Sequence, residues 1–148
     1  MEDLNAHFLI KAYIAHNRFG ELLGMDFEIL SEGEVNYHME ITRDHLATPA
    51  ASHGGAIAAL MDAALGVASL SVVCLSNRVV STVEMNIRFL RPALLGDELT
   101  ARASVISRGN RIIVTESKIY NQHNQLVAIG SGTFNAYPME KAGFLIQS

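Results

Sequence analysis

Four consecutive residues, Ser52-His53-Gly54-Gly55, precede a long apolar segment and are the first candidate for chemistry. Ser52 or His53 is expected to begin a helix, which leaves the N–H groups of Gly54 and Gly55 without intrahelical acceptors. The start of a helix carries a partial positive charge, and glycine lets a ligand approach the backbone closely. This pattern favours a site for an anion or for a carbonyl oxygen that gains negative charge. The alternative is that the glycines only allow the helix to begin beside a crowded sheet.

Asp62 is the second candidate, because it is the only charged residue between His53 and Arg78. An unpaired buried carboxylate is costly, so such a group usually changes its pKa or faces a cavity. Ionisable groups in such surroundings are concentrated at functional sites. The alternative is a structural carboxylate that is satisfied by backbone donors or by a serine such as Ser69.

The spacing between these two candidates predicts how they would act together. Gly54 and Asp62 are eight residues apart, or about 12 Å along one helix axis. Reacting atoms must approach to about 3–3.5 Å, so one copy of the helix cannot easily present both groups to one carbonyl. Two antiparallel copies of the helix, related by a two-fold axis, can present both groups to one carbonyl. This predicts a homodimer with two equivalent sites at its interface. Small residues would allow the two helices to approach closely: Ala56, Ala59, Ala63, Ala64 and Gly66.

The segment that carries both candidates, Gly54 to Leu75, is long and apolar enough to resemble a membrane span. At about 22 residues it would be roughly 33 Å long as a helix. However, Asp62 lies near its middle, and no cluster of Lys or Arg flanks either end. A helix that is apolar on every side in a soluble chain is buried on every side. We therefore expect a central core helix over residues 54–75 and no association with a membrane.

The rest of the chain predicts one shorter helix and a sheet. Residues 4–19 have apolar side chains at helical spacing, and Gly20 follows them. The other segments alternate apolar and polar residues, as strands with one covered face do: 27–30 and 34–41 before the central helix, and 79–90, 98–107, 111–120 and 125–135 after it. We expect an α+β fold in which a curved antiparallel sheet of about five to six strands wraps around one long central helix, with a short N-terminal helix.

Composition limits the classes of function. The chain has 148 residues, of which 49% are hydrophobic and 18% charged, and this fits a single domain over residues 1–148. Its 11 basic and 15 acidic residues give a net charge of −4, which argues against a nucleic-acid partner. A single cysteine, Cys74, and an acidic N-terminus predict a cytoplasmic protein. The spacing of the histidines fits no metal site, and no cofactor is indicated.

The chain resembles the PaaI-like acyl-CoA thioesterases of the hotdog fold in four segments: HGGAIAALMDAALGVA, VEMNIRFLRPALLGDEL, GNRIIVTES and LVAIGSGTF. The resemblance covers residues 23–134. Its most specific part is the His53-Gly54-Gly55 motif with Asp62 nine residues after the histidine, followed by the strand end FLRP…GD.

The resemblance implies hydrolysis of an acyl-CoA thioester to a free acid and coenzyme A, in a homodimer or a dimer of dimers. The Gly54 N–H would polarise the thioester carbonyl, and Asp62 of the partner subunit would be the nucleophile or the general base. His53 would orient the thioester, and Thr82 would position the water. Many members have an Asn six residues before the histidine, whereas this chain has Ala47, so the resemblance does not carry over that polar contact to substrate or water. His45 and Thr48 are the candidate substitutes.

Two sets of these candidates have a plain structural alternative. Strand alternation puts Thr82 on the face of Glu84, opposite Val83, where it would be a solvated residue unless the strand end turns toward the dimer interface.

Coenzyme A carries phosphates, which guanidinium groups bind well, but surface arginines are more often only solvated. The residues expected to bind substrate are Gly55, Arg88, Arg91, Arg108 and Arg111.

Two other functions stay open on the sequence. One is a hotdog hydratase or dehydratase acting on enoyl-CoA, in which His53 and Asp62 would form an acid–base pair. Nine residues correspond to about 180° of helix rotation, so these two side chains do not share a face in one chain. The other is a non-catalytic acyl-CoA binding module, which Ala47 keeps open. The identity of the acyl group is not indicated.

Overall fold

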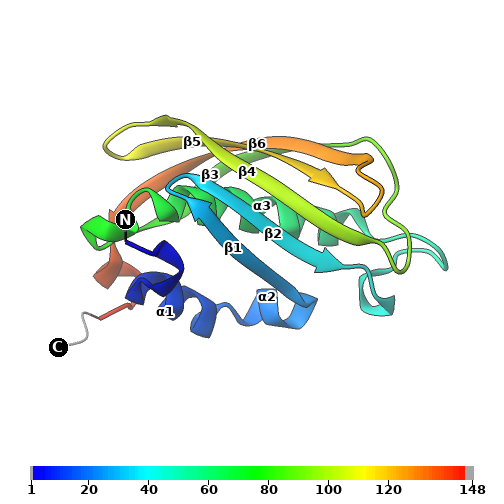
Figure 1. The fold of residues 1–148 in the computed structure, drawn as a ribbon, viewed down its shortest axis with the longest axis horizontal. Coiled ribbons are helices and arrows are strands. Elements are labelled where there is room, and N and C mark those ends of the chain that lie inside the picture. Colours follow the sequence, from blue (N-terminus) through cyan, green and yellow to red (C-terminus); the bar gives the residue numbers. More distant parts are fainter. Residues whose placement is uncertain (1, 146–148) are drawn as a thin grey trace.

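The computed structural model describes residues 2–145, which form an antiparallel sheet around one long helix (Figure 1). The sheet has six strands in the order β1-β2-β4-β5-β6-β3, and every neighbouring pair is antiparallel. The strands are β1 Met25–Ser31, β2 Glu34–Glu40, β3 Arg78–Phe89, β4 Glu98–Arg108, β5 Ile112–Tyr120 and β6 Leu126–Pro138. The expected α+β architecture is confirmed.

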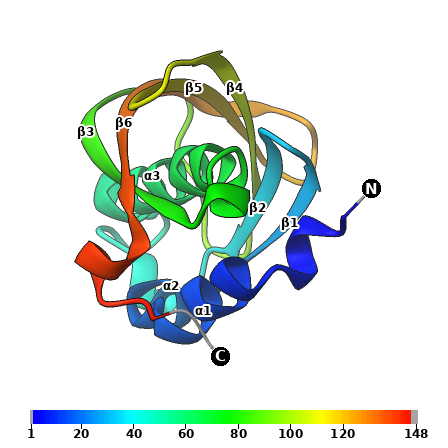
Figure 2. The same cartoon turned by 90° about the vertical axis from the view of Figure 1, so that its left-hand side faces the viewer.

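The long helix α3, Gly54–Ser71, lies inside the curve of the sheet, which arches over it in the end-on view (Figure 2). It contacts all six strands. Its core-facing side chains are fully buried, among them Leu60, Met61, Ala64, Leu65 and Ala68. By length and composition alone this helix could cross a membrane. Its place under the sheet accounts for its apolar composition, as expected for a central core helix.

The central helix is shorter than predicted, because it ends at Ser71 rather than near residue 75. The Ser71 hydroxyl donates to the Ala68 carbonyl and accepts the N–H of Gly33 from the β1–β2 turn at 2.7 Å. The β-branched Val72 and Val73 follow, which disfavours continuing the helix. A short 3₁₀ turn, η3 Cys74–Ser76, then leads into β3.

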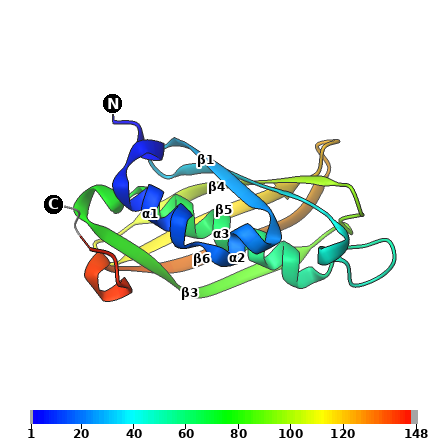
Figure 3. The same cartoon turned by 90° about the horizontal axis from the view of Figure 1, so that it is seen from below.

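The N-terminal helix predicted over residues 4–19 is divided into three pieces: η1 Leu4–Ala6, α1 Phe8–His16 and α2 Arg18–Leu23. The Asn17 side chain causes the second break, since its Oδ1 accepts the Gly20 N–H and so caps a new helix. Gly20 therefore lies inside α2, and Gly24 ends this helix with a φ of 73°. Seen from below, α1 and α2 run across the side of α3 that the sheet leaves open, between the edge strands β1 and β3 (Figure 3).

Strand β3 has an irregularity that regular alternation does not predict. Thr82 pairs with Phe134 and Glu84 pairs with Thr133, so Val83 is an extra residue, a β-bulge. Phe134 is buried under the sheet, whereas Thr133 donates to Glu84 on the outer face. The prediction that Thr82 shares a face with Glu84 is therefore wrong. The bulge turns Thr82 inward.

Candidate active site

Asp62 and Thr82 meet at the inner face of β3. The Thr82 Oγ1 donates a hydrogen bond to Asp62 Oδ1 at 2.8 Å. Asp62 comes from the middle of α3, and Thr82 reaches it because of the bulge at Val83. Ser69, the alternative partner in the sequence, instead donates to the Leu65 carbonyl and pairs with Thr115. Asp62 is thus oriented by a hydroxyl and is not held by a salt bridge in the described part of the chain.

A cavity of about 220 Å³ opens beside this pair. Its walls come from α1, α3, β3, the end of β6 and the segment that follows β6: Leu9, Tyr13, Asp62, Ala63, Gly66, Leu70, Val79, Val80, Ser81, Thr82, Tyr137, Ala142 and Phe144. Of the outcomes that the sequence left open for Asp62, the structure shows a place on the wall of a cavity. The contributions of Tyr13 and Phe144 were not predicted, since no local pattern relates either segment to α3.

Tyr13 contributes its ring to the cavity, while its hydroxyl is bonded elsewhere. The Asn17 side chain donates to the Tyr13 hydroxyl at 3.2 Å and to the Tyr37 hydroxyl at 3.3 Å. Burial raises the pKa of Tyr13, while the hydrogen bond to Tyr37 lowers it and the nearby charge of Asp62 raises it. Tyr13 is therefore neutral at physiological pH and presents mainly apolar surface beside Asp62.

At the start of α3, the two glycine N–H groups differ in what they can bind. Neither has an intrahelical acceptor, as expected. His53 is the N-cap residue, and its Nδ1 accepts the Gly55 N–H at 2.7 Å. This leaves the exposed Nε2 of His53 to carry the ring proton. The Gly54 N–H has no acceptor among residues 2–145, so Gly54 offers the free donor and Gly55 does not.

Gly54 lies beside the end of β3. A Cβ placed on Gly54 would be 3.5 Å from the Phe89 ring, an ordinary contact distance. Gly54, Phe89 and Arg91 line one surface hollow of about 290 Å³, together with Ser52, Ile57, Leu90, Pro92 and Ala93. A group bound in this hollow would therefore lie beside both Gly54 and Arg91.

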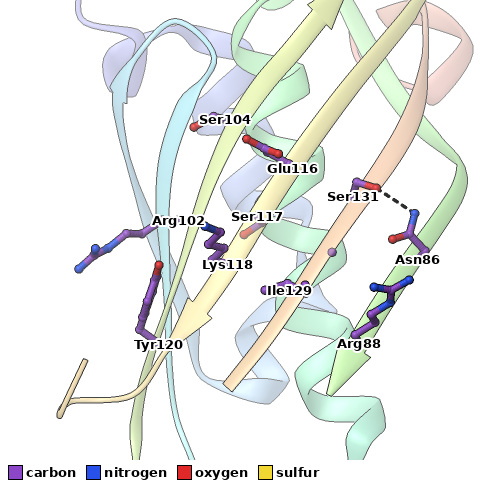
Figure 4. A pocket seen from close by; sticks show the side chains of 11 residues that line it. Asn86, Arg88, Arg102, Ser104, Glu116, Ser117, Lys118, Tyr120, Ile129 and Ser131 are labelled. Carbon is purple, nitrogen blue, oxygen red and sulfur yellow. Dashed lines mark hydrogen bonds between the residues drawn. The ribbon is translucent and has the colours of Figure 1, made fainter. Parts of the chain in front are cut away.

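The four candidate arginines are not brought together. Arg88 points to the outer face of the sheet, where it lines a separate hollow of about 510 Å³ with Arg102 and Lys118 (Figure 4). Arg108 binds Glu32 at 2.6 Å, and Arg111 is exposed just after it in the β4–β5 turn. This turn lies at the far end of α3, where Val105 binds Gly33 and Gly33 binds Ser71. Only Arg91 lies near Gly54 in the same chain.

Two expectations, one about the small residues of α3 and one about His45, need correction. Ala56 and Ala64, predicted to allow close approach of a second helix, are already buried within the single chain, at 9% and 0% exposure. Ala58, Ala59, Ala63 and Gly66 are half-buried and make up the small-residue face of α3 that the sheet leaves open. His45, considered as a substitute for the missing Asn, is buried and engaged, because Nδ1 accepts from Thr42 and Nε2 donates to the Leu23 carbonyl.

Cys74 is a fully buried core residue. Burial raises the pKa of its thiol to about 11, so it is protonated and unreactive at neutral pH. Among residues 2–145, no group of three or more His, Cys, Asp or Glu side chains is arranged to hold a metal ion.

Comparisons with a family model, with known relatives and with solved structures agree on the class of this protein. A model of the thioesterase superfamily matches residues 51–128. The acyl-coenzyme A thioesterase PaaI of Escherichia coli (strain K12) is 32% identical over 128 residues, which cover 86% of each chain. The solved E. coli PaaI structure superposes with a TM-score of 0.80 at 29% identity, over 86% of this chain and 90% of that chain. Acyl-coenzyme A thioesterase 13 of Homo sapiens is 27% identical over 84% of this chain and 89% of its own length.

The sheet wrapped around one buried helix is thus the hotdog fold of thioesterases. The chain belongs to the thioesterase superfamily and is a PaaI-like enzyme that hydrolyses thioesters. The relatives in the comparison include proteins named as acyl-coenzyme A thioesterases from both bacteria and animals.

Proposed function

We propose that this protein hydrolyses acyl-CoA thioesters at a site shared between two subunits, with Asp62 from one and Gly54 from the other. The observation that carries the proposal is the Asp62 carboxylate, which is oriented by Thr82 at 2.8 Å and lines a largely apolar cavity. A carboxylate so placed can act on a thioester carbonyl whose acyl group enters the cavity.

The separation of the two groups supports a shared site. Gly54 and Asp62 lie on one continuous helix, eight residues and thus about 12 Å apart along its axis. No single carbonyl can contact both groups within one chain, because reacting groups must be within about 3–3.5 Å. Two antiparallel copies of α3 would bring each Gly54 to the Asp62 of the other copy.

The edge strand β3 supports such a pairing. One edge of β3 pairs with β6, and its other edge has no partner among residues 2–145. Three apolar side chains on or just after this strand, Val83, Phe89 and Leu90, are 53–60% exposed. An unpaired edge of this kind is a template for pairing with another strand. Pairing of β3 with its two-fold copy would extend the sheet and set the small-residue faces of the two α3 helices side by side, in a dimer or a dimer of dimers.

The proposed reaction adds water to the thioester. A water oxygen bonds to the carbonyl carbon, the carbon–sulfur bond breaks, and the water proton ends on the sulfur of coenzyme A. Asp62 either removes that proton as a general base or attacks first and forms an anhydride, which water then hydrolyses. The Gly54 N–H stabilises the negative charge on the carbonyl oxygen. The Nε2–H of His53 orients the thioester, and Arg91 attracts a phosphate of coenzyme A.

The test is release of the coenzyme A thiol from a panel of aliphatic and aryl acyl-CoA esters. Asp62→Asn keeps the shape of the side chain but removes its basicity, and it should lower kcat by about 100-fold or more. A fully active Asp62→Asn enzyme would refute the role of Asp62. Hydration of an enoyl-CoA without thiol release, or tight binding of every ester without turnover, would contradict the reaction itself.

We also propose that the protein is cytoplasmic. The buried, unpaired Cys74, which is the only cysteine in the chain, supports a reducing compartment.

A further inference from the structure

The outer face of the sheet carries three cationic side chains in one row. The strand register places Arg102 of β4 directly opposite Lys118 of β5. In the same row, Ile129 of β6 separates Lys118 from Arg88 of β3. All three cationic residues are exposed, and they line the hollow of about 510 Å³ that Figure 4 shows. The row concentrates positive charge on a chain whose net charge is −4.

The charges of this row are not compensated within the chain. Among residues 2–145, none of the three side chains forms an ion pair or donates a hydrogen bond. Of the described residues that line the hollow, Glu116 is the only acidic one. Like charges directly opposite each other on neighbouring strands, as in Arg102 and Lys118, destabilise a sheet. A bound anion would remove this repulsion, so the row favours a site for a negatively charged ligand.

The spread of the donors indicates more than one negative group on that ligand. Neighbouring strands are about 4.8 Å apart, so the backbones at Lys118 and Arg88 are about 10 Å apart. The Asn86 amide donates to the Ser131 hydroxyl at 2.8 Å, which leaves the Ser131 O–H able to donate to a ligand. Ammonium, guanidinium and hydroxyl groups are all good donors to phosphate oxygens. A polyphosphate matches this arrangement better than a single carboxylate.

One end of the row offers a flat surface. The Arg102 guanidinium lies over the Tyr120 ring, 4.8 Å from its centroid. In Figure 4 this pair lies on one side of Lys118, and Arg88 lies on the other. Guanidinium planes and aromatic rings are surfaces on which nucleobases stack. The hollow thus combines a stacking surface at one end with phosphate-binding groups at the other, which is the pattern of a nucleotide.

The sheet separates this hollow from the proposed reacting groups. Asp62 lies at the inner face of β3, where Thr82 binds it, whereas the cationic row lies on the outer face. Gly130 lines the hollow, and a Cβ placed on it would be 3.0 Å from the Met61 sulfur on α3. A ligand in the hollow would therefore lie across one layer of sheet from α3 without contact to Asp62.

We propose that the outer hollow is a second site, which binds a free nucleoside polyphosphate. Lys118 and Arg88 hold the phosphates, and the base stacks on the pair of Arg102 and Tyr120. This inference goes beyond the proposed hydrolysis and does not depend on it. The nucleotide part of coenzyme A has the same chemistry, so the experiments must distinguish the two sources.

The first test measures ATP binding by calorimetry at low ionic strength, because salt screens exposed charges, with adenosine as the uncharged comparison. Lys118→Gln and Arg88→Gln should each weaken ATP binding by about tenfold or more, since each removes a charged donor to phosphate. Glu116→Gln removes the acid that lines the hollow and should tighten binding. Equal binding of adenosine and ATP would overturn the phosphate site.

The matched control is Lys141→Gln. Lys141 is exposed in the short turn η4, Met139–Ala142, and does not line the hollow. This variant removes the same charge as Lys118→Gln and should leave ATP binding unchanged. If it weakens binding as much as Lys118→Gln does, the effect comes from net charge, and the assignment of the hollow is wrong.

Arg102→Lys tests the stacking surface, because it keeps the charge and removes the planar group. It should weaken the binding of ATP more than that of inorganic tripolyphosphate, which has no base. If the variant changes the two affinities equally, the base does not stack there, and the ligand is not recognised as a nucleotide.

The last test distinguishes free nucleotide from coenzyme A. ATP binding should be unchanged when the protein is saturated with the non-hydrolysable thioether S-octyl-coenzyme A. Displacement of ATP would mean that the hollow holds the nucleotide part of coenzyme A, and the second site would be refuted. Light scattering then gives the number of subunits in each variant. If Lys118→Gln changes that number and the wild type binds no ATP, the face is an interface between copies of this chain, and the proposal is wrong.

Discussion

The Thr82 hydroxyl donates to the Asp62 carboxylate at 2.8 Å although regular strand alternation would put Thr82 on the opposite face of the sheet. The β-bulge at Val83 makes this contact possible, since Thr82 pairs with the inward Phe134 while Glu84 pairs with the outward Thr133. Bulges often redirect a side chain next to an active site. Here the bulge supplies the only hydrogen-bond donor to Asp62 among residues 2–145.

The first prediction concerns this hydroxyl. Thr82→Val keeps the shape of the side chain but removes the donor, so the carboxylate loses its orientation, and kcat should fall by about tenfold or more. Thr82→Ser keeps the donor and should retain most of the activity. Because Thr82 is exposed in the single chain, the thermal unfolding temperature of both variants should stay near that of the wild type. Equal kcat values for the Val and Ser variants would show that the hydroxyl has no catalytic role.

The second prediction concerns the Gly54 N–H. Gly54→Pro removes this single donor at the first position of α3, where proline is well tolerated. The preceding His53 already has the extended backbone, φ −63° and ψ 137°, that a following proline requires. If the N–H stabilises the carbonyl oxygen, kcat should fall by about 100-fold.

Gly54→Ala is the control for this variant. It keeps the N–H and adds a methyl group at an ordinary 3.5 Å from the Phe89 ring. Activity near wild type in Gly54→Ala, together with loss in Gly54→Pro at unchanged thermal stability, would assign the effect to the donor. Equal losses in the two variants would assign it to the bulk of the side chain instead.

Much of the arrangement of α3 could be predicted from its sequence. Its start at Gly54 follows from the His53 cap and the two glycines, and its burial follows from its apolar composition. The exposure of Asp62 to a cavity follows from the cost of burying an unpaired carboxylate. The 12 Å separation of Gly54 and Asp62 depends only on helix geometry. These features are local, which is why the sequence alone was sufficient.

Features that depend on tertiary contacts were not predicted. Alternation along residues 79–90 has no signal for an extra residue at Val83, because the bulge is defined only by pairing with β6. The helix expected over residues 4–19 is broken at Asn17, whose side chain binds both Gly20 and the Tyr13 and Tyr37 hydroxyls. The cavity beside Asp62 is lined by both Tyr13 and Phe144, which are 131 residues apart in the sequence.

The third prediction uses Cys74 and alkaline pH. Burial raises the pKa of this thiol from 9.0 to about 11. Between pH 9 and pH 11, the thiol of the unfolded chain therefore loses its proton while the thiol of the folded chain keeps it. The folded state then binds more protons, and the free energy of unfolding decreases as pH rises through this range, by about 3 kcal/mol at most. Below pH 9 the thiol should not affect the pH dependence.

Urea unfolding at a series of pH values measures this effect. Cys74→Ala should lower stability at neutral pH, because it leaves a small cavity, but it should reduce the slope of stability between pH 9 and 11. The buried Tyr13 and Tyr37, whose pKa values burial also raises, should account for the decline that remains above pH 10. An unchanged slope in Cys74→Ala would mean that the thiol ionises equally easily in both states.

The last prediction tests whether the site is shared between subunits. Asp62→Asn and Gly54→Pro should each be nearly inactive as homodimers, because every site lacks one of the two groups. In a mixed dimer, one site combines the intact Gly54 of the first variant with the intact Asp62 of the second, and the other site carries both defects. Co-refolding of equal amounts makes about half of the dimers mixed, so about a quarter of the wild-type activity should return. If both groups act within one chain, every chain in the mixture carries a defective site, and the mixture should be no more active than the average of its two components.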